Sequence, residues 1–400
     1  MRIALVTHRF VKGDGQGRVN YEIARAALDA GHEIWLVAAE IAPELAARPL
    51  AHSVCLGLPL WKPALIREQL FAIRSGFWLR RNRRRFDLVH ANGFITWANA
   101  DINTSHFVHS AWLRSPAHTA KLRRDWYGVY QWIYSRVNSV LERWAYQRSS
   151  VVVAVSNRVR DELISAGIAP ERIRVLANGV DPTEFTPTPV ARESLGLPTL
   201  GMLLLFVGDI RTPRKNLETV LRAMTRLPGV TLAVAGLLAN SPYPKIAAAL
   251  GVAERVRFLD YRRDVPLLMR AADVLVFPSR YEAYGLVILE ALASGLPVVA
   301  ARTVGGAELV TPQCGVLLDD ANDAAALADA VSSLATDSEA RSRMRVAARK
   351  VAEAHSWSLT ARRYLDVYDE CSGDGTSAAP TAVSPDSVRS HLGTCGRPSA

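Results

Sequence analysis

Two glutamates, Glu282 and Glu290, are the residues of this sequence most clearly arranged for chemistry. Glu290 is the only charged residue between Leu286 and Leu296, a stretch of Leu, Val, Ile and Ala that predicts a buried helix beginning near Leu286. A carboxylate among apolar side chains is costly unless something pairs with it, and vicinal ribose hydroxyls are natural partners. Glu282 falls in the glycine-containing loop before this helix, where the unpaired N–H groups of the first turn favour an anion. The pattern therefore predicts a site for a ribose and an anionic group.

A basic loop follows the strand predicted over residues 202–207 and carries Arg211, Arg214 and Lys215. A bound diphosphate needs cations as well as backbone donors, and lysine and arginine supply them. The alternative interpretation is a solvated loop of mixed charge, because Asp209 lies in the same loop. The position of the loop directly after a strand favours phosphate binding.

Three alternate glycines, Gly13, Gly15 and Gly17, lie between the first predicted strand and a helix predicted over residues 19–30. Glycine lets a ligand approach the backbone closely. A nicotinamide-dependent enzyme would need Gly-x-Gly-x-x-Gly directly after the strand, but Asn20 stands where the third glycine should be. An NAD(P)-dependent enzyme is therefore the weaker alternative.

The segment 278–297 resembles the signature of glycosyltransferase family 4, in which two acidic residues are separated by seven others. Here Glu282-x7-Glu290 is followed by residues usual in that family, namely Ala291, Ala293, Gly295, Pro297, Val298, Val299 and Ala300. The resemblance covers residues 1 to about 370. It implies the GT-B fold, in which two Rossmann-like domains face each other across a cleft. It also implies retaining transfer of a sugar from a nucleoside-diphosphate sugar to a hydroxyl acceptor.

By this resemblance the C-terminal half holds the donor. Glu290 would bind the donor ribose, and Glu282 would act beside the donor sugar. The loop between these acids would contribute Tyr284, Gly285 and Leu286 to the donor site.

The resemblance also assigns roles in the basic loop. Lys215 matches the phosphate-binding lysine of the family, but Asp209 replaces the arginine that usually follows the glycine after this strand. Arg211 and Arg214 are the candidates to replace it. Lys215, one arginine and the helix N-terminus would stabilise the charge of the leaving group, which makes Lys215 a catalytic residue together with Glu282.

In the N-terminal half, the resemblance makes Gly15 and Gly17 the points of the glycine loop nearest the donor. His106 would face the transferred sugar as a third catalytic residue, with His109 as the second candidate for this position. His90 would only line the cleft. A lone histidine more often has a structural role, which is the alternative for all three.

Strand and helix patterns alternate along most of the 400 residues and restart at Gly201, which is typical of two parallel α/β domains. We expect an N-terminal acceptor-side domain over residues 1–180, a proline-rich linker over 181–200 and a nucleotide-sugar-binding domain over 201–355. A helix over 356–371 would cross back to the N-terminal domain. Residues 372–400 are rich in Ser, Gly, Pro and Thr and predict a disordered tail.

The net charge of +10 is concentrated in residues 61–150, which hold 15 Lys/Arg, 5 Asp/Glu and seven of the nine tryptophans. Basic residues interleaved with aromatic ones suit an anionic membrane surface, and the alternative is a solvated basic face over buried aromatics. Nucleic acid is not expected as a partner, because no recognition motif accompanies the charge. Acceptors of the family bind in this variable region, so we expect a lipid-linked saccharide or an envelope or capsular polysaccharide precursor.

No part of the sequence reaches the roughly 18 apolar residues of a membrane-spanning helix, and no cleavage site follows the apolar start. We therefore expect a cytoplasmic protein that is at most peripheral at the inner face of the membrane. The four cysteines are scattered, and no Asp-x-Asp motif is placed to hold Mg²⁺ at a diphosphate. We expect no metal or other cofactor. A sugar-nucleotide epimerase of the same fold and a non-catalytic nucleotide-sugar-binding protein remain alternatives.

Overall fold

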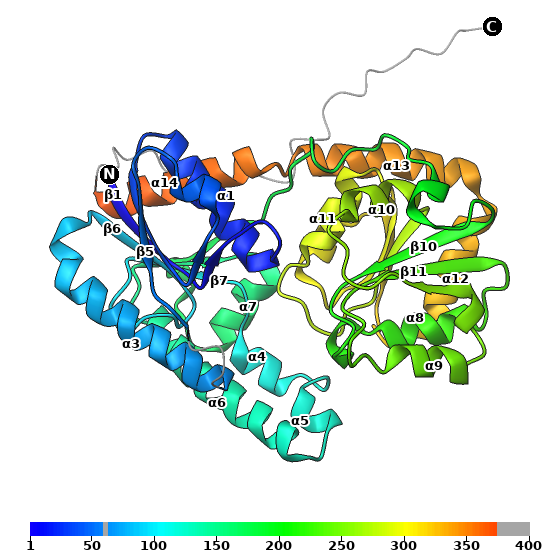
Figure 1. Ribbon diagram of the computed structural model, residues 1–400, viewed down its shortest axis with the longest axis horizontal. Coiled ribbons are helices and arrows are strands. Elements are labelled where there is room, and N and C mark those ends of the chain that lie inside the picture. Colours follow the sequence, from blue (N-terminus) through cyan, green and yellow to red (C-terminus); the bar gives the residue numbers. More distant parts are fainter. Residues whose placement is uncertain (59–62, 374–400) are drawn as a thin grey trace, which may run out of the picture.

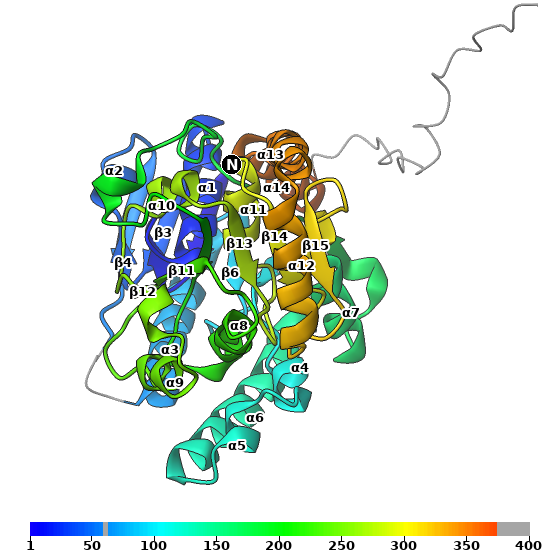
Figure 2. The same cartoon turned by 90° about the vertical axis from the view of Figure 1, so that its right-hand side faces the viewer.

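The computed structural model describes residues 1–58 and 63–373, which form two α/β domains lying side by side (Figure 1). Each domain is built on a parallel sheet with helices on both faces (Figures 1 and 2). This is the predicted pair of Rossmann-like domains. From residue 374 onward, the tail predicted over 372–400 lies outside the described residues.

In the described part of the chain, the N-terminal sheet has seven parallel strands in the order β5-β3-β1-β6-β7-β8-β9. Their bounds are β1 Arg2–Val6, β3 Glu33–Ala38, β5 Ala51–Cys55, β6 Leu88–Asn92, β7 Ile102–Ser105, β8 Val151–Ala154 and β9 Ile173–Val175, and a separate pair is formed by β2 Arg9–Phe10 and β4 Glu40–Ile41. The sequence placed β6 two residues too early, at 86–90. It did not identify β5, because this edge strand is mostly exposed and lacks an apolar pattern.

The helices of this domain are α1 Gly15–Asp29, α2 Pro43–Ala46, α3 Ala64–Asn82, α4 His109–Arg114, α5 Thr119–Leu122, α6 Trp126–Tyr146 and α7 Asn157–Ser165, with the 3-10 helices η1 Arg83–Arg85 and η2 Pro170–Arg172. α1 begins at Gly15 instead of the predicted residue 19 because Asp14 caps it, accepting a hydrogen bond from the Gln16 amide at 3.2 Å. The prediction of a glycine loop is therefore wrong in part, since Gly15 and Gly17 lie in the first turn of a helix.

In the C-terminal domain, the described residues form six parallel strands in the order β12-β11-β10-β13-β14-β15. Their bounds are β10 Met202–Val207, β11 Val230–Ala235, β12 Val256–Phe258, β13 Val274–Phe277, β14 Val298–Ala301 and β15 Gly315–Leu318. The first five lie within one residue of the strands that the sequence predicts, at 202–207, 230–235, 256–258, 274–277 and 297–301. Successive side chains of β10 enter opposite cores, Leu203 and Leu205 on one face and Leu204 and Phe206 on the other, which is why the strand reads as a continuous apolar run.

The helices that cover this sheet are α8 Leu217–Met224, α9 Tyr243–Ala249, α10 Val265–Ala271, α11 Leu286–Ala293, α12 Ala324–Thr336 and α13 Ser338–Glu353, with η3 Arg192–Leu195, η4 Pro213–Lys215, η5 Ala253–Arg255 and η6 Gly305–Leu309. The last helix, α14 Trp357–Ser372, runs back over the N-terminal domain and packs on α1 and β6 (Figure 1).

The two places where the chain crosses between the domains lie against each other. The Val180 N–H donates to the His355 carbonyl at 3.0 Å, and the Trp357 N–H donates to the Val180 carbonyl at 3.1 Å. Gly179 is needed here because a Cβ atom at this position would lie only 2.6 Å from the Trp357 nitrogen. The crossings therefore form one paired backbone connection between the domains.

Candidate active site between the domains

The loops at the carboxyl ends of the two sheets meet at the domain interface, where open α/β sheets bind ligands. Phe107 follows β7 and Tyr281 follows β13, and the centroids of their rings are 5.1 Å apart. A Cβ atom at Gly15, the first residue of α1, would lie 4.0 Å from Leu286 Cδ1, at the start of α11. The predicted site residues of both halves therefore gather at one interface.

The basic loop after β10 is fixed by Asn216, which has a left-handed backbone with φ of 64° and is completely buried. Its side-chain amide donates to the carbonyl of Pro278 at 3.0 Å and to that of Ala321 at 2.6 Å. These bonds tie the loop to the segments that follow β13 and β15. Asn216 was not predicted as a site residue; the available signal was an asparagine directly before a helix, a residue type that tolerates this conformation.

Arg214 and Lys215 both bind the carboxylate of Glu282. Arg214 Nη1 lies 2.8 Å from Glu282 Oε2, and Lys215 Nζ donates to the same oxygen. Burial opposes ionisation of Glu282, yet the two cations hold the pKa of its carboxyl below the usual value. Burial lowers the pKa of the Lys215 ammonium, while Glu282 acts in the opposite direction. Two cations face one carboxylate, so the group keeps a net positive charge for an anion.

Arg211 is engaged elsewhere. Its Nε lies 2.9 Å from Asp209 Oδ1, its Nη2 lies 3.1 Å from Asp209 Oδ2, and 47% of its side chain is exposed. Asp209, which stands in place of the usual arginine, therefore pairs with Arg211. Of the two arginines that the sequence left open, Arg214 is the one that lies beside Lys215.

The start of α11 is open to an anion. Gly285 precedes it with φ of 83°, and a Cβ atom there would lie 2.9 Å from Val304 Cγ1. No side chain caps this end. The Ile288 N–H donates to the Gly285 carbonyl at 3.0 Å, and the N–H groups of Leu286 and Val287 before it can bind a ligand. The side chain of Tyr284 is buried, and its hydroxyl donates to the Asn178 carbonyl at 2.9 Å. Only the main chain of Tyr284 can therefore contact a donor.

Glu290 lies one turn further along α11 and is half-buried. Its carboxylate has no hydrogen-bond or ion-pair partner among the described residues. Burial raises the pKa of this carboxyl to about 7, while Arg18 lowers it and Glu184 raises it. A half-buried carboxylate without a protein partner can accept hydrogen bonds from ribose hydroxyls, as predicted for this residue.

The N-terminal glycines differ in what surrounds them. A Cβ atom at Gly17 would lie 2.9 Å from Val11 Cγ2, so this glycine allows the preceding loop to pack on α1. Gly15 faces the start of α11, and a Cβ atom at Gly13 would lie 3.7 Å from the Tyr261 hydroxyl of the C-terminal domain. Gly13 and Gly15 are therefore the glycines seen to approach the C-terminal domain.

His106 follows β7 directly, and its Nε2 lies 2.9 Å from Asn92 Oδ1 at the end of β6. The Asn92 amide nitrogen donates to the Val6 carbonyl at 3.3 Å, so its oxygen accepts from His106 Nε2–H. Burial lowers the pKa of His106 to about 4, which keeps the ring neutral at neutral pH. A neutral histidine at this place can hydrogen-bond a sugar hydroxyl but cannot supply a positive charge.

The other two histidines are held inside the N-terminal domain. His109 Nδ1 lies 2.7 Å from Glu142 Oε1, which binds this histidine to α6. His90 is fully buried, with Nδ1 2.8 Å from the Tyr368 hydroxyl and Nε2 2.8 Å from Thr104 Oγ1. The expectation that His90 lines the cleft is wrong, because its position inside β6 directs the ring into the layer between β7 and α14.

Within residues 1–58 and 63–373, no three His, Cys, Asp or Glu side chains are grouped so that they could hold a metal ion. Independence from metals remains a prediction.

Two family models match the chain, one on each domain. The model described as glycosyltransferase family 4 matches residues 13–184. The model described as glycosyl transferases group 1 matches residues 188–351. Together the two matches cover most of the residues that build the interface.

A D-inositol 3-phosphate glycosyltransferase of Salinispora arenicola is 31% identical to this chain over 97% of this chain and 92% of its own length. The solved sucrose-phosphate synthase of Thermosynechococcus elongatus superposes with a TM-score of 0.77 at 21% identity, covering 94% of this chain and 100% of that one. Anabaena Alr3699/HepE in complex with UDP-glucose gives a TM-score of 0.69 at 21% identity, covering 92% and 100%. These structures share the fold of both domains.

Proposed function

Because the chain belongs to glycosyltransferase family 4 and is a sugar transferase of the GT-B fold, we propose that it moves a sugar from a nucleoside-diphosphate sugar to a hydroxyl acceptor with retention at the anomeric carbon. One observation carries the proposal: Arg214 and Lys215 converge on Glu282 beside the open start of α11, and Glu290 lies one turn further on. This group supplies cations for a diphosphate and separate carboxylates for a sugar and a ribose.

The cations would act on the leaving group. Negative charge grows on the diphosphate as its bond to the sugar breaks, and fixed cations in a partly buried site stabilise such charge better than water does. Phosphate oxygens would compete with Glu282 for Arg214 and Lys215. The freed carboxylate of Glu282 could then accept hydrogen bonds from sugar hydroxyls, while the first turn of α11 binds the phosphates.

The N-terminal domain would orient the sugar and admit the acceptor. His106 is neutral and fixed by Asn92, which leaves its Nδ1 able to accept a hydrogen bond from a sugar hydroxyl. Gly15 brings the start of α1 close to the donor side of the interface. In this proposal the N-terminal domain recognises hydroxyl groups of the sugar, and the C-terminal domain carries the charged groups that bind the donor.

We further propose that the protein works as a peripheral protein at the inner face of the cytoplasmic membrane. α3 and α6 lie on the same side of the N-terminal domain (Figure 1) and expose apolar side chains: Phe77 is 69% exposed, Trp126 is 88% and Trp132 is 50%. The exposed Arg74 and Arg123 lie on or beside these helices. Among the described residues no helix is long and apolar enough to cross a bilayer. Aromatic and basic side chains together suit an anionic lipid surface.

A cavity of about 460 Å³ opens on this surface. It is lined by Gln69, Ile73, Gly76, Phe77, Arg80 and Trp97. A lining of apolar and aromatic side chains that also includes Arg80 suits a lipid chain near a phosphate group. This supports a lipid-linked saccharide, or an envelope or capsular polysaccharide precursor, as the acceptor.

A second acceptor class is favoured by a different observation. The Salinispora relative, which matches nearly the whole chain, is named for D-inositol 3-phosphate, a small soluble polyol phosphate. This compound needs no membrane surface, so a soluble polyol phosphate is the alternative to a lipid-linked acceptor.

The proposal is tested by incubating the full chain with UDP-, GDP- and ADP-sugars and measuring free nucleotide. Release from one donor that depends on an acceptor is the expected result. Conversion of the donor without any acceptor would show an epimerase instead, and binding without release would show a non-catalytic protein. Supplying either inositol phosphate or a lipid-linked saccharide in vesicles distinguishes the two acceptor classes.

A further inference from the structure

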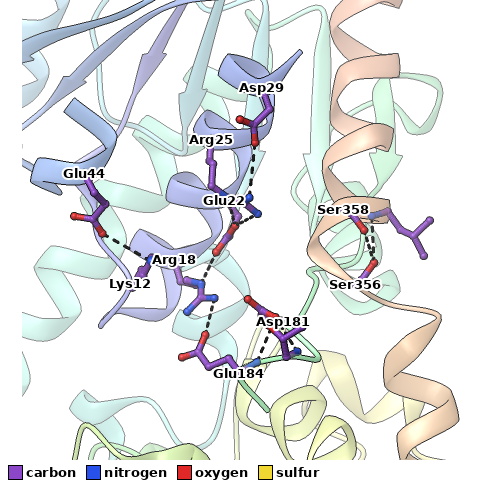
Figure 3. Close-up of polar contacts among 12 residues, drawn as sticks. Lys12, Arg18, Glu22, Arg25, Asp29, Glu44, Asp181, Glu184, Ser356 and Ser358 are labelled. Carbon is purple, nitrogen blue, oxygen red and sulfur yellow. Dashed lines mark hydrogen bonds and ion pairs between the residues drawn. The ribbon is translucent and has the colours of Figure 1, made fainter. Parts of the chain in front are cut away.

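Arg18 is a buried arginine on α1 at the domain interface, with 11% of its side chain exposed. Its Nε lies 2.8 Å from Glu22 Oε1, one turn along the same helix, and its Nη2 lies 2.8 Å from Glu184 Oε2 in the linker. Figure 3 shows the guanidinium between these two carboxylates, with Arg25 on the far side of Glu22. Two charge-assisted bonds from different segments fix the position of the guanidinium.

The helices α1 and α11 bring Arg18 toward Glu290. Their first turns are in contact, because a Cβ atom at Gly15 would lie 4.0 Å from Leu286 Cδ1. Arg18 lies one turn beyond Gly15, and Glu290 lies one turn beyond Leu286. Arg18 and Glu290 therefore lie on two helices whose starts face each other across the domain interface, near enough for the charge of Arg18 to act on Glu290.

Charged residues lie on the elements that are adjacent to α11. These are Arg18 and Glu22 on α1, Asp181 and Glu184 in the linker, Glu308 on η6, and Arg345, Arg349 and Glu353 on α13. Arg349 is occupied by main-chain carbonyls, including that of Ala293 at 2.8 Å. Burial raises the pKa of Glu290 most, and the charges that act on it are those of Arg18, which lowers it, and Glu184, which raises it.

We propose that Arg18 is a positioning residue of the donor site, which acts through Glu290: held by Glu22 and Glu184, it keeps the ribose-binding carboxylate ionised across the domain interface. This inference rests on the proposed function, because it assigns Glu290 to the donor ribose. The carboxylate in one domain depends on a cation in the other, so donor binding and contact between the domains favour each other. Glu184 in the linker opposes Arg18 and weakens this coupling.

The test is the pH dependence of donor affinity, measured by calorimetry with the nucleoside-diphosphate sugar that the donor panel selects, without acceptor. Affinity in the parent should fall as the pH drops through about 7, because protonation removes the charge that strengthens the ribose hydrogen bonds. Arg18→Gln should move this fall to higher pH and weaken binding at neutral pH by about three- to tenfold. Glu184→Gln should move the fall in donor affinity to lower pH. Arg18→Lys should restore most of the parent profile.

Arg25→Gln is the matched control, because Arg25 also pairs with Glu22 on α1 but has no direct effect on Glu290. Its profile should match that of the parent. Glu184 is 40% exposed, so Glu184→Gln folds even if loss of Arg18 destabilises the protein. Donor binding with the same pH profile in the parent, Arg18→Gln and Glu184→Gln would overturn this inference alone. No donor binding by the parent would overturn the proposed function and this inference with it.

Discussion

The two domains bring different kinds of groups to their shared interface. The C-terminal side is charged, with Arg214, Lys215 and Glu282 joined in one ion-pair group and Glu290 one helical turn away from the open start of α11. The N-terminal side brings His106, which is uncharged and bound to Asn92, and Arg18, whose charge is balanced by Glu22 and Glu184. On its outer surface, however, that domain carries most of the exposed apolar residues: α3 to α6 hold ten of the seventeen large ones in the described residues.

This difference follows from what each domain would bind. A nucleoside diphosphate always carries the same charges and the same ribose, so fixed cations, carboxylates and a helix N-terminus can recognise it. An acceptor differs from enzyme to enzyme, and a surface of helices with exposed aromatic and basic residues can change without disturbing the donor site. Substitutions on the two sides should therefore have different effects, on donor turnover in one case and on surface binding in the other.

The largest effect is expected at Lys215. Replacing it by methionine removes a cation that would stabilise the leaving group and leaves Glu282 with Arg214 alone, so turnover should fall by about 10²- to 10³-fold. Arg211→Gln is the control, since Arg211 already pairs with Asp209 on the exposed side of the same loop. Steady-state rates of nucleotide release measure both variants. Equal losses in the two would contradict the assignment of Lys215.

A smaller effect is expected for the outer surface of the N-terminal domain. Changing Trp126 and Trp132 together to serine removes two exposed aromatic side chains from α6 and should weaken binding to anionic vesicles roughly tenfold. Flotation with vesicles of different anionic lipid content measures this. Val346→Ser on α13 removes an apolar residue that is 59% exposed in the other domain and should leave flotation unchanged. Unchanged vesicle binding by the double tryptophan variant would contradict the membrane proposal.

Tyr284→Phe tests whether this side chain acts in structure or in donor binding. The substitution removes the hydrogen bond from its hydroxyl to the Asn178 carbonyl at 2.9 Å, so the free energy of unfolding should fall by about 1 kcal/mol. Donor affinity should stay within about twofold, because the hydroxyl is occupied within the protein. Thermal unfolding and calorimetry measure the two effects. A large loss of affinity with unchanged stability would place this hydroxyl in the donor site.

No effect is expected from removal of metal ions. In the proposed mechanism Arg214, Lys215 and the start of α11 take the place of a metal at the diphosphate, so treatment with EDTA should leave the rate of nucleotide release unchanged. Complete loss of activity that Mn²⁺ restores would show that this part of the mechanism is wrong.

The donor side could be predicted from the sequence because its chemistry is contiguous. Glu282, Glu290 and the glycine between them lie in one strand–loop–helix segment, and an isolated acid in an apolar helix is visible without any structure. The same applies to the strands of the C-terminal sheet, whose β-branched and leucine-rich runs are separated by glycine and proline.

The N-terminal contributions could not be predicted in the same way, because distant segments assemble them. Arg18 meets Glu184 across 166 residues, and Tyr284 meets Asn178 across 106. His90 and His106 are alike in the sequence, and only the packing of α14 on β6 shows that the first is enclosed in the domain. The early start of α1 was missed although Asp14 is a common capping residue, because the glycines after it favour a loop.

In the proposed mechanism Glu290 binds the ribose while Glu282 acts beside the sugar, and calorimetry with the bare nucleoside diphosphate distinguishes these two roles. At a pH well above 7, where Glu290 is ionised, Glu290→Gln should weaken binding by roughly ten- to a hundredfold, since hydrogen bonds to a charged group contribute about 1.5–3 kcal/mol. Glu282→Gln should bind the diphosphate as tightly as the parent or more tightly, because it frees Arg214 and Lys215, while turnover falls. Parent-like binding by Glu290→Gln, or equal losses in both variants, would contradict this assignment of the two glutamates.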